Sequence, residues 1–95
     1  MKLPSNAAQV LGRWVLVDGK VSGDEACRQI EWLTTHHLRK LAISEQSGAW
    51  ETLFQDPDDD RFWEQTYPQG EMHGGGPPRL MVLTLSQARS KYRFD

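Results

Sequence analysis

Residues 49–67 read AWETLFQDPDDDRFWEQTY, with an aromatic-rich stretch on each side of a run of aspartates. Aromatic and β-branched residues are typical of strands, whereas Asp and Pro are typical of the turns that join strands. The pattern therefore predicts a β-hairpin with strands at 49–55 and 62–67.

The aromatic residues select the register of this hairpin. Placing Phe54 opposite Trp63 also places Trp50 opposite Tyr67, so that four rings gather on one face. A shift of one residue would scatter these rings over both faces. We expect the first register, with an aromatic face turned toward the core.

Further strand patterns lie before and after the hairpin. Residues 11–17 are rich in β-branched and aromatic residues and stop at Asp18-Gly19, a dipeptide that tolerates the positive φ of a tight turn. Apolar side chains on both faces of 11–17 predict a central strand that is covered on both sides. Residues 38–44 and 79–85 are predicted as two more strands.

Two helices are predicted from capping and spacing. Ser22 and Glu25 have the form of a capping box, in which each side chain accepts from the other residue's amide. Apolar residues recur at helical spacing after it, which predicts an amphipathic helix ending near Thr34 or Thr35. The stripe that faces the core consists of Ala26, Ile30, Leu33 and His37. Residues 86–91 are predicted as a short second helix capped by Ser86.

These elements define an α+β fold. Residues 68–78 are predicted to be a loop, because their glycines are flexible and their prolines remove hydrogen-bond donors. The order β-α-β-β-β-β-α predicts a mostly antiparallel β-sheet covered on one face by the main helix. Because 95 residues build one core, we expect a single domain over 1–95, with 1–9 loosely ordered. The large side chains expected in the core are Trp14, Trp32, Trp50 and Trp63.

Composition and charge argue against several classes of protein. A net charge of −2 argues against a nucleic-acid partner, which usually requires a strong basic excess. The single cysteine, Cys27, excludes an internal disulfide, and residues 1–9 lack the apolar core of a signal peptide. The apolar run at 80–83 is far shorter than the roughly 20 residues that span a bilayer. We expect a cytoplasmic protein with no membrane anchor.

The middle of the chain is strongly acidic. Between Glu45 and Glu71, eight acidic residues stand against the single basic residue Arg61. The aspartates at 56–60 are either an ordinary solvated turn or a patch that steers a basic partner, which raises association rates by roughly one to three orders of magnitude at low salt. They lack the loop pattern of a calcium site.

The candidates for catalysis and metal binding each have a simpler interpretation. His36 and His37 are adjacent, so on a strand they would point to opposite faces and would not share an ion. Cys27 lacks the Cys-His signature of an activated nucleophile. The glycines at 74–76 lead into two prolines and not into the Lys-Ser/Thr of a phosphate loop. We expect no catalytic, cofactor-binding or metal site; a small enzyme that uses Cys27 or a histidine pair is the alternative.

Several motifs along the chain carry a family resemblance. They are GRW at 12–14, VDGKV at 17–21, DEAC at 24–27, WETLFQDP at 50–57, RFWE at 61–64 and YPQGEMHGGGPP at 67–78. Together they closely resemble the immunity protein 27 family of bacterial polymorphic toxin systems, over about residues 10–92. Asp59 and Asp60 stand where the family is expected to have Asn or Gly, and Gly70 stands where a serine is expected.

The resemblance implies an antidote that binds and neutralises a cognate toxin domain. Such families have no known shared catalytic site, so inhibition would follow from a protein interface of about 1,600 Å². Loops held out by a rigid sheet are the expected contact regions. The residues expected to face the partner are Asp58, Asp59, Asp60, Glu71 and His73, on a surface shaped by Gly74, Gly75 and Gly76. An adaptor module unrelated to toxins is the second alternative, and the sequence leaves the oligomeric state open.

Overall fold

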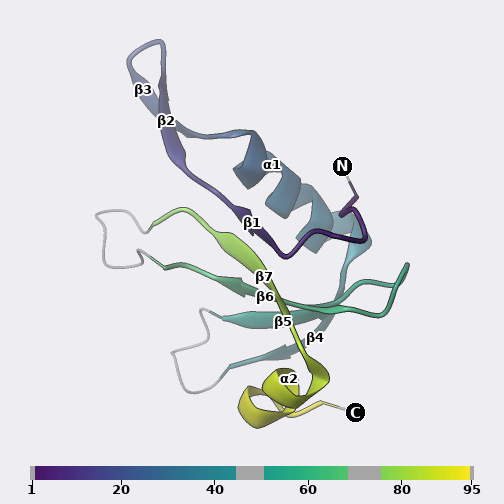
Figure 1. Ribbon diagram of the computed structural model, residues 1–95. Coiled ribbons are helices and arrows are strands. Elements are labelled where there is room, and N and C mark those ends of the chain that lie inside the picture. Colours follow the sequence, from purple (N-terminus) through teal and green to yellow (C-terminus); the bar gives the residue numbers. More distant parts are fainter. Residues whose placement is uncertain (1, 45–50, 69–75, 95) are drawn as a thin grey trace.

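The computed structural model describes residues 2–44, 51–68 and 76–94 (Figure 1). Its elements in chain order are β1 (Gln9–Leu11), β2 (Trp14–Val17), β3 (Lys20–Gly23), α1 (Glu25–Trp32), the π-helical turn η1 (Leu33–His37), β4 (Arg39–Ile43), β5 (Thr52–Gln55), β6 (Phe62–Thr66), β7 (Arg79–Leu83) and α2 (Leu85–Lys91). None of these helices has the length and apolar character that crossing a membrane requires. The expected α+β fold class is confirmed, with antiparallel strands and the main helix packed on a sheet.

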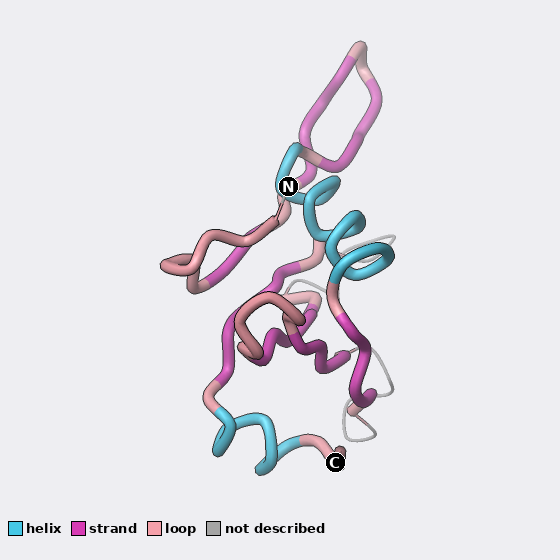
Figure 2. Tube along the Cα trace, turned by 90° about the vertical axis from the view of Figure 1, so that its right-hand side faces the viewer, coloured by secondary structure: helices cyan, strands magenta, loops and turns pink. Residues whose placement is uncertain are grey.

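The main sheet lies between the two helices. Its strand order is β1-β7-β6-β5-β4, and each neighbouring pair is antiparallel. Helix α1 packs on one face and α2 on the other, and Figures 1 and 2 show them on opposite sides of the strands. The sheet is therefore buried on both faces by helices that are far apart in the sequence.

The hairpin of β5 and β6 has the register predicted from its aromatic residues. Phe54 lies opposite Trp63, and both rings are buried beneath α1 and η1 with Ile30 and Leu33. Trp63 exposes none of its surface. Trp50 lies outside the described residues, and Tyr67 is partly exposed. The pair of Phe54 and Trp63 thus confirms the predicted register.

The alternate side chains of the same strands form the opposite core. Leu53 contributes to a second cluster with Ala88 and Tyr92 of the α2 region. A polar contact crosses this interface, because the Tyr92 hydroxyl donates to the buried Glu64 carboxylate at 2.7 Å. Burial, together with that carboxylate, raises the pKa of the Tyr92 hydroxyl above its usual value. Lys91 lies 2.7 Å from Glu64 and completes the anchoring of the C-terminal helix.

The prediction of a central strand at 11–17 is wrong. Residues 9–11 join the edge of the main sheet as β1, whereas β2 pairs with β3 in a separate hairpin. The Asp18-Gly19 turn has positive φ at both residues, 52° and 78°, as the dipeptide predicted. This turn geometry favours a tight two-residue hairpin, so the β-branched residues pair locally.

Gly12 marks the break between the sheet and the hairpin. Its amide donates to the Pro78 carbonyl at 2.9 Å, and a Cβ at this position would lie 2.7 Å from the same oxygen. The chain passes close to the start of β7 at Gly12 and then leaves the sheet. Trp14 is consequently 40% exposed and is not the core residue expected from its size.

The predicted helix caps are each displaced along the chain. Asp24, and not Ser22, caps α1, because its side chain accepts from the Cys27 amide at 3.0 Å. Ser22 belongs to β3, where the strand pairing places it two residues before the cap. Thr84, and not Ser86, caps α2 in a capping box with Gln87. The residue types of the caps fit the general rule, but the strand ends decide which residue takes the position.

We expect Trp63→Ala to lower the free energy of unfolding by about 3–5 kcal/mol, because it opens a cavity between the sheet and α1. Chemical denaturation measures the change. Trp14→Ala is the matched control, and its exposed ring predicts a much smaller effect, within about 0.5 kcal/mol. Equal losses in the two variants would contradict the placement of Trp63 in the core.

Asp24→Ala is expected to cost about 1 kcal/mol at neutral pH, whereas Ser22→Ala leaves the cap intact. The hydrogen bond from the Cys27 amide holds the pKa of Asp24 below its ordinary value of 3.8. The ionised carboxylate therefore favours the folded chain above that pH, and its contribution is lost as the pH falls through the folded-state pKa. Denaturation curves against pH should show the two proteins, native and Asp24→Ala, converging in acid; a constant difference would argue against an ionised cap.

Candidate functional site

His37 is held at the end of the main helix by an irregular turn. After Trp32 the α-helix widens into η1, and the Leu38 amide donates to the Leu33 carbonyl at 2.7 Å. Such π-type turns occur frequently at functional sites. The His37 ring stacks on the Trp32 ring, with centroids 5.7 Å apart and planes 17° apart. The imidazole is therefore fixed by packing and mostly buried.

Asp56 and Asp58 belong to the tight turn between β5 and β6. The Asp56 amide donates to the Arg61 carbonyl at 2.9 Å, and the Asp60 amide donates to the Asp56 carbonyl at 2.8 Å. The Asp56 carboxylate accepts from the Asp58 amide at 2.8 Å, which is an Asx turn. Asp56 is 1% exposed, so this turn holds a carboxylate inside the protein.

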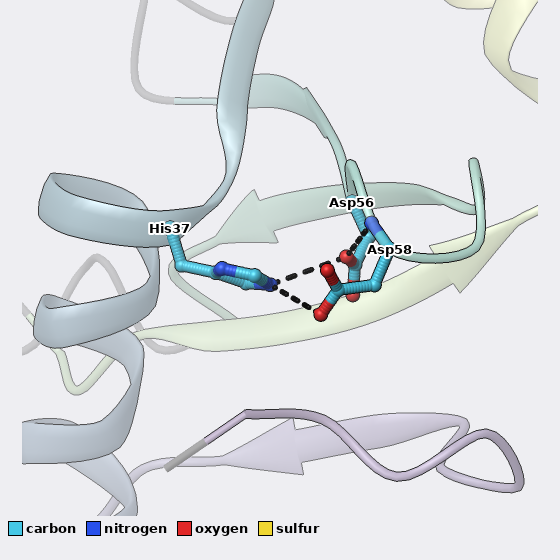
Figure 3. Close-up of side chains that lie close together, drawn as sticks. All are labelled: His37, Asp56 and Asp58. Carbon is cyan, nitrogen blue, oxygen red and sulfur yellow. Dashed lines mark hydrogen bonds and ion pairs between the residues drawn. The ribbon is translucent and has the colours of Figure 1, made fainter.

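These three side chains meet in the cluster drawn in Figure 3. The His37 Nε2 lies 3.2 Å from the Asp56 Oδ1 and 3.3 Å from the Asp58 Oδ2. No local pattern indicates this contact, because 19 residues separate His37 from Asp56. His36, the neighbour of His37 in the sequence, is exposed, whereas the partners of His37 lie on the turn between β5 and β6.

Arg61 ties the same turn to the N-terminal segment. Its guanidinium donates to the Ala7 carbonyl at 2.6 Å and to the Pro4 carbonyl at 3.0 Å, and it lies 5.0 Å from the centre of the Trp63 ring. Leu3, one residue before Pro4, packs in the core beneath α1. The one basic residue in the acidic middle of the chain therefore holds the turn and the N-terminal segment together.

A second surface lies on the β2–β3 hairpin, which projects away from the body of the molecule in Figures 1 and 2. Leu16 and Val21 face each other across the two strands, and they are 75% and 68% exposed. Other exposed apolar residues of the hairpin are Trp14, Val15 and Val17. We call these five residues the apolar hairpin surface. The pattern of residues 11–17 predicts a strand covered on both sides, so it does not indicate an exposed surface there.

Comparison with known proteins identifies the family of this chain. A family profile described as Immunity protein 27 matches residues 16–84, well over half of the chain. The chain belongs to the immunity protein 27 family. No curated protein and no solved structure matches it. The match begins within the apolar hairpin surface and includes His37, Asp56 and Asp58.

In this immunity family member, the aspartates expected to face a partner lie on the exposed turn between β5 and β6. Asp58 is shared between His37 and Lys2, and the Lys2 Nζ lies 3.6 Å away. Asp59 is paired with Arg61; burial opposes ionisation there, but the hydrogen bonds and charge of Arg61 outweigh it and lower the pKa of Asp59. Asp60 has a left-handed backbone with φ of 62°.

The remaining residues expected to face a partner lie mostly in a segment that the structure does not describe. Glu71, His73, Gly74 and Gly75 fall outside the described residues. Gly76 is described and is buried, as is Pro77 after it.

Cys27 is part of the packing at the start of α1. Its thiol donates to the Arg13 carbonyl at 3.5 Å, and a Cβ on Gly12 would lie 2.6 Å from the sulfur. Burial raises the pKa of the Cys27 thiol. A raised pKa keeps the sulfur protonated, which is the opposite of what activates a nucleophilic cysteine.

Proposed function

We propose that this protein binds a cognate toxin domain and neutralises it, with the apolar hairpin surface as the centre of the contact. Membership of an immunity protein family supports a toxin as the partner. The exposure of Leu16 and Val21 on a projecting hairpin supports this surface as the toxin contact. The inhibitor acts without catalysis, in the compartment where the toxin would otherwise harm the producing cell.

The exposed apolar side chains of the hairpin are energetically unfavourable in water. A β-hairpin by itself is marginally stable, and this one presents apolar side chains to water on both of its faces. On one face Leu16 and Val21 lie opposite each other, and large exposed apolar side chains that lie together mark binding surfaces. When a partner covers Leu16 and Val21, the free energy of binding becomes more favourable by about 25 cal/mol for each Å² of apolar surface removed from water. Apolar anchors surrounded by polar groups are typical of the residues that dominate binding energy.

The acidic turn has a different role in this proposal. Figure 1 shows the hairpin and the turn between β5 and β6 on opposite sides of the molecule. Charge acts over a distance, so Asp58, Asp59 and Asp60 steer a basic toxin toward the protein without lying at the centre of the interface. Glu71, His73, Gly74 and Gly75 stay in the proposed set of partner-facing residues, whereas Gly76 is buried in the free protein.

The hairpin is tested by the double variant Leu16→Gln and Val21→Thr. We expect its affinity for the toxin domain encoded beside the gene to fall by about tenfold or more, because two apolar anchors lose their buried contacts. Calorimetric titration and rescue of growth in cells that express that toxin domain are the measurements. The melting temperature should barely change, because both side chains are exposed in the free protein.

Leu85→Gln is the matched control, since Leu85 is 45% exposed on the far helix α2. It should rescue growth as well as the native protein does. Full neutralisation by the double variant would exclude the hairpin from the interface. If the native protein neutralises no toxin but still binds another cellular protein, the adaptor alternative replaces the proposal.

Steering is tested separately with Asp60→Asn. Asparagine tolerates the left-handed backbone at this position, so the substitution removes a charge without straining the turn. We expect slower association with the toxin domain at low salt and a weaker dependence on ionic strength, with an unchanged dissociation rate. Stopped-flow mixing at several salt concentrations measures both rates. An unchanged association rate would remove this turn from the proposal.

A further inference from the structure

We infer that His37, Asp56 and Asp58 form a binding site for one divalent transition-metal ion of the zinc class. The three side chains come from the η1 turn and from the turn between β5 and β6, and Figure 3 shows them directed toward one another. One ligand atom from each lies within 4.8 Å of the other two. This inference is independent of the toxin contact proposed for the hairpin, although Asp58 also belongs to the turn that is proposed to steer the toxin.

The spacing of the ligand atoms fits a single ion. Zinc binds imidazole nitrogen and carboxylate oxygen at about 2.0–2.2 Å, so two ligands in a tetrahedral site lie about 3.3 Å apart. The distances from the His37 Nε2 to the two carboxylate oxygens are 3.2 and 3.3 Å. The three ligand atoms lie within 4.8 Å of one another, so the two carboxylates would close in around an ion held by His37.

The site is also held in place before an ion binds. The His37 ring is stacked on Trp32, and the Asp56 carboxylate is fixed by the Asp58 amide. The side chains of His37 and Asp56 are 10% and 2% exposed. Ligands whose orientation is set by packing and by neighbouring hydrogen bonds lose little freedom on binding a metal.

The donor set indicates the kind of ion. One imidazole nitrogen with two carboxylate oxygens suits zinc, cobalt, nickel or manganese, whereas calcium and magnesium prefer sites made of oxygen alone. Three protein ligands leave at least one coordination position, on the side where the Asp58 side chain is 52% exposed. Water or a donor group from another molecule fits that position.

The charges around the cluster favour a cation. The cluster contains two acidic side chains, and Asp56 is buried, where an uncompensated charge is costly. The cation beside the cluster is Lys2, at 3.6 Å from Asp58, and its side chain is 63% exposed. Arg61 forms an ion pair with Asp59 and donates hydrogen bonds to the carbonyls of Pro4 and Ala7. A divalent ion would compensate the charge of the two acidic side chains.

A bound ion would join two parts of the chain that otherwise meet through hydrogen bonds. It would fasten the end of the main helix to the acidic turn across 19 residues of sequence. Since an ion that binds the folded chain alone raises stability, metal should increase the melting temperature. A simple imidazolium bridge between the carboxylates is the rival interpretation, and it predicts no response to metal.

The experiment is a calorimetric titration of the full chain with zinc chloride near pH 7.5, together with thermal unfolding in the presence and absence of zinc. We expect one ion per chain and a higher melting temperature, with no comparable effect of magnesium chloride. Asp58→Asn should weaken zinc affinity by about tenfold or more and abolish most of the thermal shift. Asp58 is largely exposed, so this variant should fold, and His37→Gln is the second ligand variant.

Three controls cover the other groups that bind zinc or alter the same turn. His36→Gln and Cys27→Ser should keep native affinity, because neither side chain belongs to the cluster. Asp59→Asn removes a neighbouring carboxylate from the turn and should also bind zinc normally. Absence of one-to-one binding, or binding that survives Asp58→Asn, would overturn the inference. Loss of binding in His36→Gln or Cys27→Ser would do the same, because it would place the ion elsewhere.

Discussion

The cross-strand contact between Phe54 and Trp63 is the interaction on which the rest of the structure depends. Both rings are buried beneath the main helix, and their register decides which side chains of β5 and β6 face each core. A shift of one residue would exchange the two faces and turn these rings toward α2. The strands then alternate strictly, so Leu53 and Phe62 reach the second core while Phe54 and Trp63 reach the first.

The strand register set by Phe54 and Trp63 also fixes the geometry of the acidic turn. Because Gln55 pairs with Phe62, the six residues between them must close the hairpin, and Asp56 does so through its own carboxylate. The closure buries that carboxylate and directs it toward His37, while Arg61 lies over the Trp63 ring and reaches the N-terminal segment. The polar cluster is thus positioned by the apolar core directly behind it.

The molecule carries an apolar surface and an acidic surface in different places. The projecting hairpin presents apolar side chains, and the turn at the other side presents carboxylates. Apolar burial supplies binding energy over short distances, whereas charge acts at longer range and is screened by salt. In the toxin binding proposed above, the carboxylates act during the approach of the partner and the apolar side chains act in the contact itself.

Local sequence determined the central hairpin, the main amphipathic helix, the Asp18-Gly19 turn and the family, because each of these depends on residues close together in the chain. It placed the helix caps imperfectly, since a strand end fixes which of several suitable residues becomes the cap. Only the tertiary structure decided that Trp14, Val15 and Leu16 leave the sheet, because the close approach of Gly12 to Pro78 is a contact between distant segments. The same holds for His37 with Asp56 and Asp58: no local pattern encodes a distance between side chains that the packing of a helix end against a β-turn creates.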